Sequence, residues 1–177
     1  MSYITGSGMQ LIAKNVLGSA AASVTFSSIP GNFNHLHIRL CAGGSNASNT
    51  VALNIALNGS VGNIHYRQNL QGTNATASAA YAGAVNISYL GEIPAANGVD
   101  GASGCGEYII DILSYTLTTF NKMIISTGGF ANSNAGQSFS FRNSGGFSST
   151  AAITSMIFSA ASGNLVAGSS FYLYGII

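Results

Sequence analysis

The chain has 177 residues, of which 47% are apolar and only 5% are Asp, Glu, Lys or Arg, and its formal net charge is +1. This length suits one domain that can fold without a metal or disulfide staple, and the high apolar content excludes a disordered chain. Because the five basic residues are scattered, no local positive charge could displace counterions from a nucleic acid, and we expect no nucleic-acid partner.

Residues 1–8 lack a basic start followed by an apolar run, so we expect no signal peptide. Gly, Asn or Ser interrupts every apolar stretch before it reaches the roughly 18 residues of a membrane span. We therefore interpret residues 1–8 as an N-terminal arm and residues 9–177 as a single domain with no membrane partner.

Residues 9–177 contain short runs rich in Ile, Val, Phe, Tyr and Thr, and Gly, Asn and Ser bound these runs. The pattern predicts strands and turns rather than helices. Since no segment could form a helix long enough for a parallel crossover, the predicted fold is all-β, an antiparallel and jelly-roll-like β-sandwich. The predicted strands are residues 9–14, 22–29, 33–41, 51–57, 63–70, 81–90, 106–114, 121–130, 137–143, 153–160 and 168–176.

Three predicted strands show a clear alternation of side chains. In residues 33–41 it gives one apolar face, which we expect to lie in the core, formed by Leu36, Ile38 and Leu40. In residues 51–57 it gives a second apolar side, formed by Val51, Leu53, Ile55 and Leu57. In residues 137–143, Phe139 and Phe141 share one face.

Turn residues divide these runs. Asn58-Gly59 can supply the two positive φ angles of a type I′ turn, so we predict a hairpin between the strands at 51–57 and 63–70. Residues 72–80, which are mostly small, predict one long loop, and residues 91–106 predict another. Because long loops on a rigid sandwich often carry partner contacts, we expect residues 91–106 and the N-terminal arm to make such contacts.

The chain has only four acidic residues and three histidines from which a catalytic or metal site could be built. Glu107 and Asp111 lie about 13 Å apart along one predicted strand, too far for the paired carboxylates of a glycosidase, and we interpret them as a solvated face or partners for arginine. His35-Leu36-His37 points two imidazoles the same way, as in cupin metal sites, but Arg39 follows on that face. We expect a polar surface there, no catalytic or metal-binding residues, no cofactor and no enzymatic activity.

The cysteines and tyrosines leave alternatives open. Cys41 and Cys105 lack CxxC or zinc-like spacing, so they are either buried free thiols, the reading we favour, or one long-range disulfide. Tyrosines with Asn nearby could stack on a sugar, although tyrosines at the rim of a sandwich are more commonly structural. The candidates are Tyr66, Tyr81, Tyr89 and Tyr115.

The end of the chain carries its most specific pattern. Gly168-Ser169-Ser170-Phe171-Tyr172-Leu173-Tyr174-Gly175-Ile176 resembles the closing strand of tailed-bacteriophage virion proteins, which end in Gly-Ser-x-Phe-x-Leu-Tyr-Gly-Ile. Shorter pieces resemble the same group in the same order, and with them the resemblance runs from about Gln10 to Ile177. These pieces are Phe26-Ser27-Ser28-Ile29-Pro30 with Leu36-His37-Ile38, Asn58-Gly59 with Gly62-Asn63-Ile64-His65-Tyr66, and Ile153-Thr154-Ser155-Met156-Ile157.

The resemblance implies a jelly-roll-like sandwich of the kind found in capsid decoration (cement) proteins and in tail or fibre components. A domain of this size without a fibre-like repeat fits a decoration protein, made in the host cytoplasm and placed on the capsid surface of the virion. Its implied partners are the major capsid protein and copies of itself, as a homotrimer at local three-fold positions. The implied alternative is a tail or tail-fibre-associated protein that binds a host surface glycan.

Overall fold

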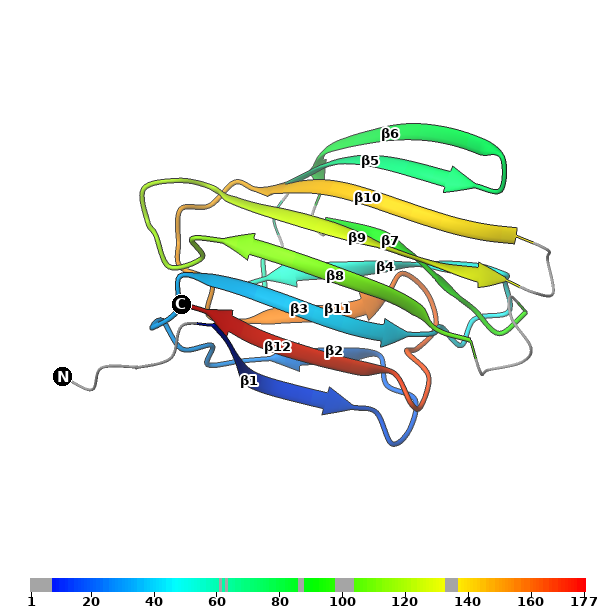
Figure 1. The fold of residues 1–177 in the computed structure, drawn as a ribbon, viewed down its shortest axis with the longest axis horizontal. Coiled ribbons are helices and arrows are strands. Elements are labelled where there is room, and N and C mark those ends of the chain that lie inside the picture. The colour runs from blue at the N-terminus through cyan, green and yellow to red at the C-terminus, as the bar shows by residue number, and fades with distance from the viewer. Residues whose placement is uncertain (1–7, 61, 63, 86–87, 98–103, 133–136) are drawn as a thin grey trace.

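A computed structural model of the chain describes residues 8–60, 62, 64–85, 88–97, 104–132 and 137–177 (Figure 1). These residues form strands and no helix, and therefore no helix that is long and apolar enough to cross a membrane. The strands are β1 (Met9–Val16), β2 (Ser23–Phe26), β3 (His35–Ala42), β4 (Thr50–Leu57), β5 (His65–Thr73), β6 (Thr76–Val85), β7 (Ser88–Pro94), β8 (Gly106–Leu113), β9 (Lys122–Asn132), β10 (Gln137–Phe147), β11 (Met156–Ala160) and β12 (Ser170–Ile176).

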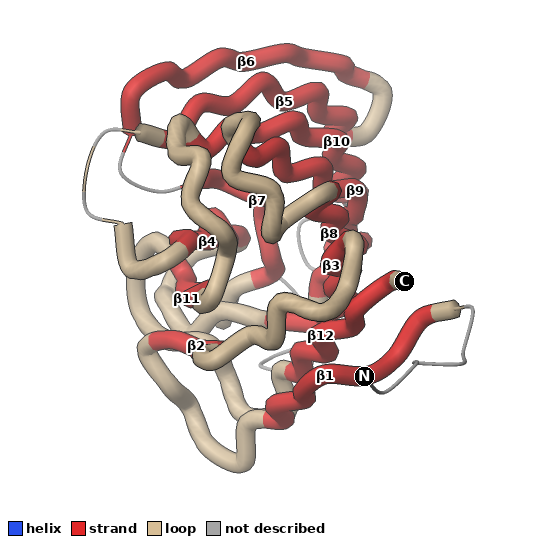
Figure 2. Tube along the Cα trace, turned by 90° about the vertical axis from the view of Figure 1, so that its left-hand side faces the viewer, coloured by secondary structure: helices blue, strands red, loops and turns tan. Residues whose placement is uncertain are grey.

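The strands form two stacked sheets, which Figure 2 shows edge-on. The larger sheet has eight strands in the order β1-β12-β3-β8-β9-β10-β5-β6, and the smaller has four in the order β2-β11-β4-β7. All pairings within both sheets are antiparallel. The predicted all-β, antiparallel sandwich is confirmed, and the repeated passage of the chain between the two sheets makes it jelly-roll-like.

The Asn58-Gly59 turn forms, but it does not make the predicted hairpin. Both residues have positive φ, 52° and 60°, and the Ser60 N–H donates to the Leu57 carbonyl. However, β4 pairs with β7 and β11, whereas β5 pairs with β6 and β10. The turn therefore carries the chain from the smaller sheet to the larger one, because a local turn signal cannot tell which strands will pair.

The loop prediction for residues 72–80 is wrong, and so is the single strand at 81–90. Residues 72–80 contain the end of β5, a two-residue turn at Asn74-Ala75 and the first half of β6. The small residues of this segment are compatible with an exposed edge strand as well as with a loop, so composition alone cannot distinguish the two. The predicted loop at 91–106 is also shorter than expected, since residues 91–94 belong to β7. Residues 98–103 and residues 1–7 of the predicted arm lie outside the described residues.

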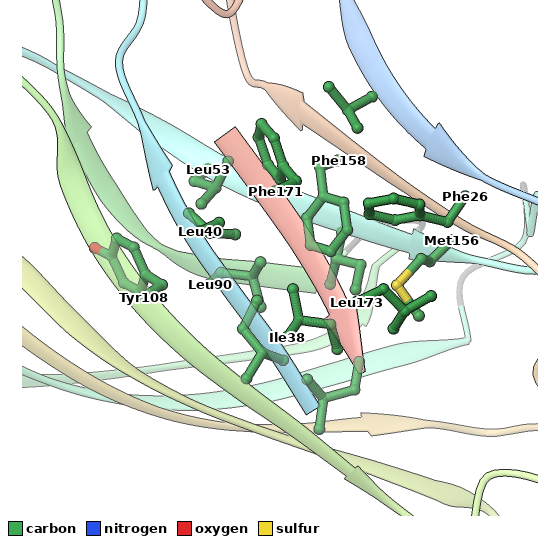
Figure 3. Close-up of a cluster of buried hydrophobic side chains, with 14 of the residues drawn as sticks. Phe26, Ile38, Leu40, Leu53, Leu90, Tyr108, Met156, Phe158, Phe171 and Leu173 are labelled. Atoms are coloured by element: carbon green, nitrogen blue, oxygen red, sulfur yellow. The ribbon is translucent and has the colours of Figure 1, made fainter. Parts of the chain in front are cut away.

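The core lies between the two sheets and is built from the inward face of each strand. The predicted inward faces of β3 and β4 are confirmed, because their apolar side chains are all buried. Phe139 and Phe141 also share a face, with ring centroids 6.2 Å apart. Figure 3 shows Phe158 of the smaller sheet meeting Phe171 of the larger, and their ring centroids are 5.3 Å apart. Burial of such rings is the main favourable term for folding.

The sequence of the closing strand β12 suits an interior strand of this sheet, where it lies between β1 and β3. Phe171 and Leu173 point into the core and are fully buried, whereas Tyr172 and Tyr174 point outward. Gly175 is pressed against the Phe33 ring, and a Cβ there would lie 2.2 Å from that ring. Only glycine permits this close approach, so the Gly in the terminal pattern has a packing reason.

Candidate functional site

The larger sheet has a broad surface, which we call the outer face, formed by its side chains that point away from the smaller sheet. Strand alternation decides its members. The register places Tyr172 of β12 beside Arg39 of β3, and Arg39 beside Ile109 of β8. The row continues through Thr127 of β9 to Arg142 of β10. The smaller sheet covers the inner face only, and no described strand lies over the outer face (Figure 2).

Most of the large apolar side chains that are exposed among the described residues lie on this outer face. Of twelve such residues, three lie elsewhere: Leu117 and Phe120 in the β8–β9 loop, and Ile177 after β12. The nine on the outer face are Met9, Leu11, Val16, Tyr66, Leu70, Tyr81, Ile109, Leu113 and Met123. An apolar surface concentrated on one face marks a site of interaction, because scattered exposure is the normal pattern.

A shallow groove of about 650 Å³ crosses the outer face over β12, β3, β8 and β9. Tyr172 and Tyr174 line it on β12, and Thr127 and Gly129 line it on β9. Three small residues, Ser170, Cys41 and Gly129, lie in one row of the sheet together with Glu107. Their short side chains leave the hollow. Such a groove offers aromatic surface and hydroxyl groups to a ligand.

The groove also holds charges of both signs. Arg39 and Glu107 are both exposed and line it from adjacent strands. Further along the same face, the Nδ1 of His37 lies 2.7 Å from an Asp111 carboxylate oxygen across β3 and β8. Asp111 thus pairs with a histidine rather than with arginine. This mixture suits a neutral partner or one with charges of both signs.

The cysteines form a disulfide, so the favoured prediction of buried free thiols is wrong. Cys41 and Cys105 are joined with a Cα–Cα distance of 5.5 Å and a sequence separation of 64 residues. Cys41 points to the outer face at the end of β3, and Cys105 precedes β8, its neighbour in the sheet. Cysteine spacing could not distinguish these alternatives, because the pairing depends on β3 and β8 being adjacent.

The sugar-stacking candidates separate into two pairs. Tyr89 and Tyr115 are buried, so neither can offer a stacking face to a ligand. Burial raises the pKa of both phenols, and the Tyr115 hydroxyl donates to the Pro30 carbonyl. Tyr66 and Tyr81 are exposed on the outer face, on β5 and β6. The groove tyrosines were missed, although the alternation in residues 168–176 placed them on one face.

The two histidines of the His35-Leu36-His37 pattern do point the same way, but protein groups engage both. His37 pairs with Asp111, and the Nδ1 of His35 accepts the Ser114 backbone N–H at 3.0 Å. Among the described residues, no three His, Cys, Asp or Glu side chains form a group that could hold a metal ion. The pattern therefore contributes polar surface to the outer face.

The remaining histidine, His65, is fully buried between two serine hydroxyls. Its Nε2 lies 2.9 Å from the Ser60 Oγ and its Nδ1 lies 2.8 Å from the Ser88 Oγ, and its ring packs on Phe147. Burial lowers the pKa of this imidazole. The histidine joins β5 to β7 across the core, and its burial closes it to a substrate.

No family model, curated protein or solved structure matches this chain. The choice of function therefore depends on the outer face and on the sequence resemblance.

Proposed function

We propose that this protein is a bacteriophage virion structural protein that decorates the capsid and stabilises it by bridging neighbouring subunits. The observation that carries the proposal is the outer face, where nine of the twelve exposed large apolar side chains of the described residues lie. A two-layer slab whose exposed apolar side chains gather on one face, among polar and charged ones, suits contact with other proteins. The terminal Gly-Ser-x-Phe-x-Leu-Tyr-Gly-Ile pattern adds the sequence resemblance that points to a virion.

The proposed mechanism is linkage. A protein that binds the assembled shell but not its separated subunits shifts the equilibrium toward the shell, and it needs no catalytic group to do so. The partners are the major capsid protein and further copies of this chain, which we propose to sit as a homotrimer on the capsid surface. The near-zero net charge helps, because copies brought close together repel one another little.

The experiment is to count copies per particle after in vitro binding to capsids that lack this protein. The Ile109→Lys variant places a charge in the middle of the outer face, next to Arg39. We expect it to reduce occupancy at least about tenfold, since a buried unpaired charge costs several kcal/mol. The matched control is Thr25→Lys, on the exposed side of β2 in the smaller sheet, which should bind like the parent protein. Equal occupancy of both variants would reject the outer face as the contact.

The N-terminal arm is a second proposed contact with the shell. Deletion of residues 1–8 should also lower the number of copies bound per capsid, because it removes this contact with a neighbouring subunit. Unchanged occupancy after this deletion would remove the arm from the proposal and leave the outer face in place.

The groove favours one alternative function, the binding of a host surface glycan by a tail-associated protein. Tyr172 and Tyr174 supply aromatic surface, and Arg39, Glu107 and Thr127 supply hydrogen-bonding groups around it. Aromatic rings with flanking polar groups are the usual means of holding a sugar. A glycan array would reveal a ligand that the Tyr172→Ala variant no longer binds. Antibody labelling of particles, on the head or on the tail, would decide between the two functions.

A further inference from the structure

The larger sheet ends in two edge strands, β1 and β6, which each pair on one side only among the described residues. An edge exposes backbone N–H and C=O groups that can pair with another chain, and proteins usually block this with Lys, Pro or a bulge. The β1 edge has two of these devices, Lys14 and an irregular register between Leu11 and Ala13. The β6 edge is different, because residues 76–85 contain no charged residue and no proline.

The geometry of the β5–β6 hairpin shows which groups of β6 are free. Its turn has two residues, Asn74 and Ala75, and Thr73 lies opposite Thr76. In such a hairpin the two residues that flank the turn form a hydrogen-bonded pair. The following pairs are alternately non-hydrogen-bonded and hydrogen-bonded. Ser78 and Ala80 therefore direct their backbone groups toward β5. The backbone groups of Ala77, Ala79 and Tyr81 point to the open side, where no described strand lies.

We infer that β6 pairs antiparallel with β6 of a second copy of this chain, about a two-fold axis. A register centred on Ala79 matches the free groups of Ala77, Ala79 and Tyr81 in both copies and forms about six hydrogen bonds. It also sets Tyr81, which is 70% exposed, opposite the small Ala77 of the second copy. The two larger sheets then join into one continuous sheet, and their outer faces become one surface.

A second copy is the occupant that best fits this edge. An antiparallel strand is complementary to itself, as a two-fold contact requires, and an uncharged strand brings no like charges together. The other edges of the described chain suit β6 less well. The β1 edge is guarded, β2 has only four residues, and β7 is largely buried against the core. This pairing is separate from capsid binding and does not depend on it.

Sedimentation velocity over a range of concentrations, with the purified full chain and no capsids, tests the inference. The parent protein should associate as its concentration rises: a monomer should form a dimer, and a trimer, which carries three β6 edges, should join further trimers through pairwise contacts. Ala79→Pro removes one free N–H without touching the bonds to β5, and Ala79→Lys sets two positive charges opposite each other. Each should raise the dissociation constant of this step at least about tenfold, which is about 1.4 kcal/mol.

The matched control is Ser140→Lys, which adds the same charge to an exposed position on β10, two strands in from the edge. It should leave the dissociation constant unchanged, and circular dichroism should show all three variants folded. If Ala79→Pro does not fold, Ala79→Lys decides. A parent protein that shows no such association step would overturn the inference, as would a step that both folded variants leave intact or that Ser140→Lys weakens equally. Because no shell is present, these results are independent of the capsid test.

Discussion

The two faces of the larger sheet come from the same strands but have different surroundings. In β12, Phe171 and Leu173 are 0% exposed on the inner face, where Phe171 packs on Phe158 of the smaller sheet. Their neighbours Tyr172 and Tyr174 lie on the outer face, which no described strand covers. One strand can therefore stabilise the fold with alternate residues and leave the residues between them available to a partner. Substitutions on the two faces should therefore have different effects.

The sharpest test compares adjacent residues of β12. Phe171→Ala removes a fully buried ring that packs on Phe158, so it should lower the free energy of unfolding by about 3–5 kcal/mol. Tyr172→Ala should change the free energy of unfolding by less than about 1 kcal/mol, because Tyr172 lies on the outer face and lines the open groove. Urea unfolding followed by circular dichroism measures both.

In a binding assay, the order of the two effects should be reversed. Tyr172→Ala is expected to weaken association with capsids or glycans, whereas a folded fraction of Phe171→Ala should bind normally. If Tyr172→Ala destabilised the protein as much as Phe171→Ala, the separation of the two faces would be wrong.

The disulfide is an exception to this division, since it stabilises the fold from the outer face. Cys41 and Cys105 close a loop with a separation of 64 residues, and restricting that loop in the unfolded chain is worth about 2–4 kcal/mol. The Cys41→Ser, Cys105→Ser double variant should lose that amount in urea unfolding. The parent protein under reducing conditions should lose the same amount, and the double variant should not respond to reductant. A parent protein insensitive to reductant would show that the bond contributes little.

The sequence predicted the inner face better than the outer one. Alternation in 33–41 and 51–57 identified buried residues correctly, because burial of an apolar side of a strand is decided by the strand's own period. Pairing between distant strands was not predictable in this way. The Asn58-Gly59 turn suggested a hairpin that the sheet order rejects, and the disulfide depends on β3 lying next to β8. Prediction of the groove likewise requires the register of four strands. Only its tyrosines could have been identified from the sequence, through the alternation in residues 168–176.

Lys122 tests whether the inner face tolerates a charge. This lysine is buried at the start of β9, and its Nζ donates to the carbonyls of Leu117, Phe120 and Thr150. Burial lowers its pKa, while the three bonds tie the β8–β9 loop and the connection between β10 and β11 to the start of β9. Lys122→Met keeps much of the volume but leaves those carbonyls without a donor, so it should cost about 2 kcal/mol in thermal unfolding. The matched control, Lys14→Met on exposed β1, should be near neutral.

The smallest expected effect is a pH dependence that comes from His65 on the inner face. Burial lowers the pKa of this imidazole below its unfolded value of about 6.5, so unfolding takes up a proton in the window between the two values. Stability contributed by the neutral ring is complete above that window and is lost as the pH falls through it. His65→Gln keeps an amide to meet Ser60 and Ser88 but cannot titrate there. Urea midpoints measured from pH 8 to pH 5 should fall more for the parent protein than for His65→Gln, and parallel curves would show that His65 is not the source of the dependence.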